Sequence, residues 1–181
     1  TTQYQRETNY KQMKKHSGMR PHDIAILLKI AAKGDTPWMM KDLAHELGIS
    51  NGEVSESIHR SVLARLISQD KKTLMKMTLL DFLEHGLPYI YPQQPGALVR
   101  GIVTAHSAPP LSENILSSEA YVWPYAEGNV RGQTIVPLHP KIPEACLKDS
   151  LFYELMALSD ALRVGRAREK KLAIEALKER V

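Results

Sequence analysis

The chain has 181 residues, of which 43% are hydrophobic and 24% are charged, and its formal net charge is +4. This is a globular composition, which excludes disordered and collagen-like chains. No apolar run approaches the roughly 20 residues that cross a bilayer, and no signal peptide opens the sequence. The single cysteine, Cys146, excludes an intramolecular disulfide and a cysteine-rich zinc module, so we expect a cytoplasmic protein.

Positive charge is concentrated toward both ends of the chain. Basic residues outnumber acidic ones in 1–20, 51–76 and 163–181, whereas acidic residues predominate in 77–162. Segregated positive charge suits a polyanionic partner, although lysine and arginine also solvate helix faces without binding anything. Charge alone leaves both interpretations open.

Four helices are predicted in the first half of the chain. Residues 1–20 have little apolar content and predict a basic arm or an exposed helix. Apolar residues at helical spacing then predict helices over 21–33, 39–47, 51–67 and 77–85. Pro21 suits a first helical turn, Gly48 ends the second of these helices, and Ser50 caps the third.

The middle of the chain is rich in proline, which forbids long helices there. Nine of the eleven prolines lie between Pro88 and Pro143. Short β-type runs at 89–91 and 97–99 predict a hairpin, and 130–136 predicts a further strand. Residues 99–101 and 130–132 repeat the tripeptide Val-Arg-Gly, which is too short to indicate an internal repeat. Helical spacing returns over 148–164 and 166–181.

The segment 39–67 carries the most specific pattern. Ala44 is small where two helices would meet, Gly48 suits a left-handed turn, and Ile49 fills the gap between the helices. Val54 and Ile58 would face back onto the preceding helix. The run resembles the helix-turn-helix of winged-helix bacterial transcription regulators, the MarR-like group in particular: Leu-Ala, then Gly-Ile-Ser, then Val-Ser, with an Ile four residues after the Val. The resemblance covers residues 21–67.

The resemblance implies a mainly α protein with a small β part. A winged helix-turn-helix domain would occupy 21–101, a Pro-rich β-containing module 102–148, and a C-terminal helical pair 149–181. Two positions depart from the family pattern: Ser61 stands where an apolar residue is usual, and Arg65 where a glycine is usual. We therefore expect the third helix to run on, and the wing to lie at 88–101 with Arg100 near its base.

In the implied complex the third helix enters the major groove of double-stranded DNA. Asparagine can pair with adenine, arginine with guanine, and glutamate can accept from cytosine, while hydroxyl groups take phosphate oxygens. A basic arm could follow the backbone or the minor groove, and a merely solvated arm is an equal alternative. The predicted DNA-binding residues are Ser50, Asn51, Glu53, Ser55, Glu56, His59, Arg60 and Arg100, with Lys11, Lys14 and Lys15 on the arm.

Five of the eleven aromatic residues lie in the Pro-rich middle: Tyr89, Tyr91, Tyr121, Trp123 and Tyr125. They suit an effector pocket or a protein-binding groove, with His106 and Arg131 orienting an anion. A small local core is the simpler interpretation. The apolar face of the C-terminal helical pair is a candidate homodimer interface, and intramolecular docking of that face is nearly as plausible.

The sequence as a whole favours a homodimeric, sequence-specific DNA-binding transcriptional regulator, a repressor that covers a promoter. An antitoxin-like protein that binds a partner protein and autoregulates its operon is the second interpretation. An enzyme is the third, because no paired acids or Gly-x-Ser-x-Gly motif accompany the His106 segment. We expect no cofactor and no metal site, since the seven histidines lack ligand spacing, and we expect no membrane association.

Overall fold

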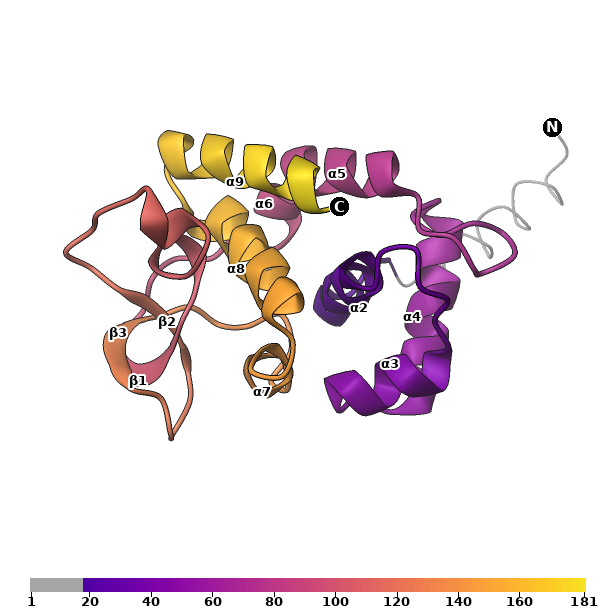
Figure 1. Cartoon of the computed structure of the whole chain (residues 1–181), viewed down its shortest axis with the longest axis horizontal. Coiled ribbons are helices and arrows are strands. Elements are labelled where there is room, and N and C mark those ends of the chain that lie inside the picture. Colours follow the sequence, from indigo (N-terminus) through magenta and orange to yellow (C-terminus); the bar gives the residue numbers. More distant parts are fainter. Residues whose placement is uncertain (1–17) are drawn as a thin grey trace, which may run out of the picture.

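Three helices lie at one end of the protein and a small sheet at the other, with α8 between them (Figure 1). The computed structural model describes residues 18–181. The protein is mainly α with a three-stranded sheet, and two 3₁₀ turns, η1 (Ala105–Ser107) and η2 (Leu111–Glu113), follow the first strand. The helices are α2 (Pro21–Ala32), α3 (Met40–Leu47), α4 (Asn51–Leu63), α5 (Lys76–His85), α6 (Leu87–Ile90), α7 (Ile142–Cys146), α8 (Ser150–Val164) and α9 (Ala167–Arg180).

The turn between α3 and α4 has the features that the sequence indicated. Gly48 adopts the left-handed conformation, with φ of 65°, and its backbone N–H caps the end of α3. The Ser50 side chain accepts a hydrogen bond from the backbone N–H of Glu53 and so caps the start of α4. Ile49, Val54 and Ile58 are buried. Helices α3 and α4 are therefore held by the predicted contacts.

The C-terminal end of α4 differs from the prediction that the helix runs on to residue 67. Helix α4 ends at Leu63, and Arg65 adopts φ of 60°, the conformation that a glycine would take most readily. Ile67 then forms an antiparallel bridge with Leu74, and the Ser68 N–H donates to the Thr73 carbonyl. A short hairpin, 67–74, thus follows α4 directly.

The Pro-rich middle forms a closed three-stranded sheet and not the predicted hairpin over 89–99. Strand β1 (Leu98–Val103) pairs antiparallel with β2 (Tyr121–Pro124) and with β3 (Val130–Thr134), and β2 and β3 pair in parallel. The first half of the predicted hairpin is instead the short helix α6. A wing at 88–101 is therefore wrong, because 98–101 belongs to this sheet.

A buried polar cluster joins the sheet to α8. The Asp160 carboxylate accepts hydrogen bonds from the Thr104 hydroxyl at 2.8 Å, the Trp123 indole N–H at 2.6 Å and the Arg163 guanidinium at 2.7 Å. Arg163 also donates to the backbone carbonyls of Tyr91 and Val136. Burial raises the pKa of Asp160, and these donors oppose that effect.

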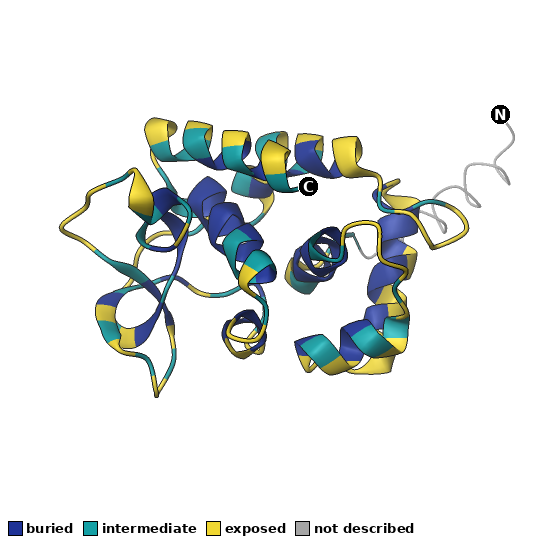
Figure 2. Cartoon of the chain, viewed as in Figure 1, coloured by how far each residue is buried: buried dark blue, intermediate teal, exposed yellow. Residues whose placement is uncertain are grey.

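One hydrophobic core runs through the helices and the sheet (Figure 2). Helix α8 packs against α2 as well as α9. The predicted units 21–101, 102–148 and 149–181 therefore share this core. Ala173, Ile174 and Leu177 of α9 are buried against the same chain. The face predicted as a dimer interface is therefore occupied by intramolecular docking. None of the helices in residues 18–181 is long and apolar enough to span a bilayer.

Candidate nucleic-acid interface

Helix α4 has one face in the core and one face in solvent. Val54, Ile58 and Val62 point into the core, four residues apart. The predicted contact residues Asn51, Glu53, Ser55, Glu56 and His59 are exposed. The structure therefore brings five of the six predicted contact residues of this helix together on its free face.

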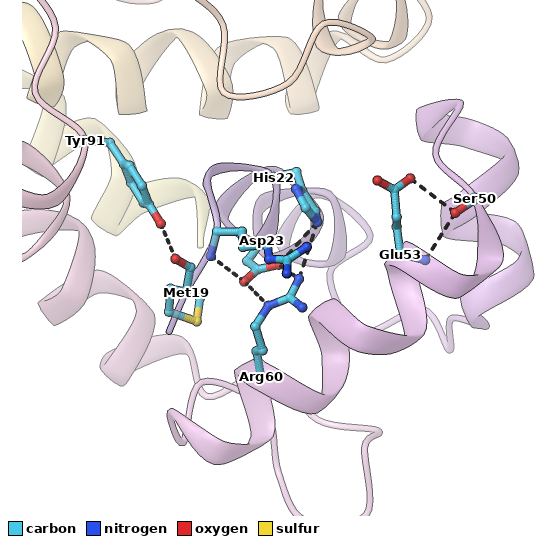
Figure 3. A network of polar contacts seen from close by, with 8 residues as sticks. Met19, His22, Asp23, Ser50, Glu53, Arg60 and Tyr91 are labelled. Atoms are coloured by element: carbon cyan, nitrogen blue, oxygen red, sulfur yellow. Dashed lines mark hydrogen bonds and ion pairs between the residues drawn. The ribbon is translucent and has the colours of Figure 1, made fainter. Parts of the chain in front are cut away.

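Ser50 and Glu53 bind each other at the start of α4 (Figure 3). The Ser50 hydroxyl accepts from the Glu53 N–H at 3.2 Å and donates to the Glu53 carboxylate at 3.2 Å. This hydroxyl bond lowers the pKa of Glu53, which therefore stays ionised at neutral pH. Ser50 therefore caps the helix, and the Glu53 carboxylate holds the capping hydroxyl in place.

Arg60 is not on the exposed face, so its prediction as a DNA contact is wrong. Its side chain is 7% exposed and forms a two-point ion pair with the fully buried carboxylate of Asp23. The Nε and Nη2 atoms lie 2.8 and 2.7 Å from the two carboxylate oxygens (Figure 3). Asp23 also accepts from the Arg20 N–H at the start of α2. Arg60 thus fixes α4 against the N-terminus of α2.

Two histidines lie beside this ion pair and the start of α4. The rings of His22 and His139 are in edge contact, with centroids 5.9 Å apart. Burial lowers the pKa of both rings. His22 Nε2 lies 3.4 Å from the Arg60 guanidinium, which can only donate, so a hydrogen bond between them requires that this ring nitrogen be unprotonated.

The hairpin 67–74 was not predicted from the sequence, and it places part of the positive charge of residues 51–76 beside α4. Lys71 and Lys72 are exposed near its tip, Arg65 is exposed at its base, and Lys76 is exposed just after it. The sequence does contain a signal for this hairpin, because apolar Leu66 and Ile67 precede a polar run that ends at Leu74. The hairpin lies beside the C-terminal end of α4 (Figure 1). Exposed basic side chains therefore adjoin the C-terminal end of α4.

The remaining predicted contacts lie elsewhere. Arg100 is on β1, in the sheet at the opposite end of the protein from α4, so it is not at the base of a wing (Figure 1). Lys11, Lys14 and Lys15 lie outside the described residues.

The five aromatic residues of the predicted effector pocket point to different neighbours. Trp123 is fully buried and bonds to Asp160, which agrees with the local-core interpretation. Tyr91 donates its hydroxyl to the carbonyl of Met19. The remaining three are placed as follows: Tyr121 packs edge-on against His106, Tyr89 is 82% exposed, and Tyr125 is half-buried. The five rings therefore have different neighbours and do not surround one opening.

No protein-family model matches this chain, and no curated protein or solved structure is significantly similar to it.

Proposed function

We propose that this protein is a winged helix-turn-helix transcriptional regulator that binds double-stranded DNA in a sequence-specific manner and represses the promoter it covers. Helix α4 is the recognition helix in this proposal, and the hairpin 67–74 is the wing. The carrying observation is the exposed polar face of α4 beside a lysine-bearing hairpin. A helix fits the major groove with its N-terminal half leading, and a neighbouring basic loop reaches the phosphates.

The charge on α4 indicates that α4 and the hairpin 67–74 contribute differently to DNA binding. The exposed face of α4 carries Glu53 and Glu56 and has no exposed lysine or arginine before Arg65. Such a face cannot draw in a polyanion by charge, but asparagine and glutamate read adenine and cytosine edges. Lys71 and Lys72 then provide the sequence-independent part of the affinity. Specificity is thus assigned to α4, and salt-dependent affinity to the hairpin.

Selection from a random duplex library tests this proposal, because the operator need not be known. We expect the wild-type protein to enrich one motif. Asn51→Ala should then cost about 1–3 kcal/mol on the motif and relax the preference at one base pair. Replacing Lys71 and Lys72 with glutamine should weaken binding to motif and scrambled duplexes alike. It should also reduce the slope of log K against log salt by about 2.

The control is Arg168→Gln, which removes an exposed arginine from α9 and should leave both affinity and salt slope unchanged. A motif with two inverted half-sites about 10 base pairs apart would indicate a homodimer. Failure to enrich any motif would contradict sequence-specific binding. Enrichment that is unaffected by the Asn51 and lysine variants would contradict the docking face.

A further inference from the structure

The repeated tripeptide Val-Arg-Gly forms a paired structure in the sheet. Residues 99–101 lie on β1 and residues 130–132 on β3, and the two strands are antiparallel. The register pairs Val99 with Gly132, Arg100 with Arg131, and Gly101 with Val130. The two tripeptides are therefore related by a local two-fold axis that passes between the arginines.

The strand geometry holds the two arginines close together. The Arg100 carbonyl accepts from the Tyr125 N–H, on the side away from β3. Arg100 and Arg131 are therefore a non-hydrogen-bonded pair, in which opposing Cα atoms lie about 4.5 Å apart and side chains share a face.

The glycine after each arginine allows β2 to lie close to both arginine-bearing strands. A Cβ on Gly101 would clash with the carbonyl oxygen of Trp123 on β2, and one on Gly132 would clash with the carbonyl oxygen of Ala120, just before β2. A side chain at either position would therefore push β1 or β3 away from β2. The two glycines thus preserve the packing of the sheet that carries the arginine pair.

The pair carries uncompensated positive charge. Both arginines are exposed, and neither forms an ion pair or side-chain hydrogen bond within residues 18–181. Like charges directly opposite each other destabilise a sheet. Both border a concavity of about 660 Å³, which is also lined by Leu98, Val99, Gly128, Asn129 and Val130. An arrangement that is unfavourable in the free protein becomes favourable when an anion binds between the guanidinium groups.

We propose that Arg100 and Arg131 bind the phosphate group of a small molecule in this concavity. Each guanidinium presents a planar fork of donors that matches phosphate oxygens. A phosphate dianion or a diphosphate neutralises both charges, whereas one carboxylate neutralises only one. Residues 88–148 contain four basic and four acidic residues, so the region lacks the extended positive field that a duplex requires. The site is independent of DNA binding by α4.

Titration with inorganic pyrophosphate at constant ionic strength, followed by calorimetry and thermal melting, tests this site. We expect saturable binding to the wild type and at least a tenfold loss of affinity in Arg100→Gln and in Arg131→Gln. Arg168→Gln should bind as the wild type does. Without pyrophosphate, each site variant should melt about 1–2 °C higher than the wild type, because the repulsion is relieved.

Three results would overturn the proposal. The first is the absence of a saturable signal with pyrophosphate, and the second is equal pyrophosphate binding by the two glutamine variants and the wild type. The third is loss of affinity for duplex DNA in the variants while pyrophosphate binds none of the proteins, which would assign the arginines to a nucleic-acid backbone. Loss of motif enrichment in the DNA selection, with pyrophosphate binding intact, would instead reject only the function proposed for α4.

Discussion

Replacing Arg60 with methionine tests whether the ion pair to Asp23 holds α4 in place. Asp23 is fully buried and the Arg60 side chain is 7% exposed, so the remaining carboxylate would be left without its partner in the core. Removing one partner of a buried pair costs about 3–5 kcal/mol. That loss is a large part of the roughly 5–15 kcal/mol by which a domain of this kind is stable.

Chemical denaturation followed by circular dichroism measures this loss. Arg60→Met and Asp23→Leu should each lower the free energy of unfolding by about 3–5 kcal/mol, and the double variant should lose much less than the sum. The exposed Arg168→Met serves as the control and should change it by less than about 0.5 kcal/mol. A loss below about 1 kcal/mol for Arg60→Met, or additive losses in the double variant, would refute the buried-pair assignment.

Three further predictions concern α4 and its surroundings. Arg65→Gly should stabilise the protein by about 0.5–1 kcal/mol, because φ is 60° there, whereas Arg65→Ala should not; equal effects in denaturation would contradict this. Within residues 18–181 the buried Ser61 hydroxyl has no hydrogen-bond partner, so Ser61→Ala should stabilise the protein by about 1 kcal/mol. Ser159→Ala should not, because the Ser159 hydroxyl donates to the Met156 carbonyl; a loss of stability in Ser61→Ala would contradict this reasoning. Because burial lowers the folded-state pKa of His22, the unfolded chain binds more protons below pH 6.5. Stability should therefore fall as the pH drops from about 7 toward 5, and the slope should be shallower in His22→Gln; an unchanged slope would contradict the assignment.

The first helices were predictable because their signals are local. Gly48, Ser50, Val54 and Ile58 act through neighbours within a few residues, so spacing alone places the turn and the buried face. The exposed face of α4 follows from the same periodicity. Helices of this kind can be predicted without knowing which distant residues they contact.

Arg60 shows why the rest of the site was missed. Ser57, Arg60 and Ser61 are all buried, so this part of the helix surface in the core is polar. The partner of Arg60, Asp23, lies 37 residues away, and no spacing rule connects the two. Tertiary packing determines a buried ion pair of this kind, and the periodicity of apolar residues carries no information about that packing.

The end of α4 and the Pro-rich middle were missed for different reasons. Arg65 takes a backbone conformation that favours glycine, so residue type pointed away from a helix end. The three strands pair across long separations, and their closure depends on glycines that allow close backbone approach. Local β-propensity therefore identified parts of β1 and β3 without revealing their partners.

Site-directed cleavage of DNA from α4 tests the central claim most directly. An iron chelate attached to Ser55→Cys would be selective, because Cys146 is buried and burial raises the pKa of its thiol. The same chelate on Arg168→Cys, at the start of α9, provides the control. If α4 lies in the major groove, position 55 should cut the selected duplex within a few base pairs of one site and position 168 should not. Absent or uniform cutting from position 55, or equal cutting from both positions, would contradict the account.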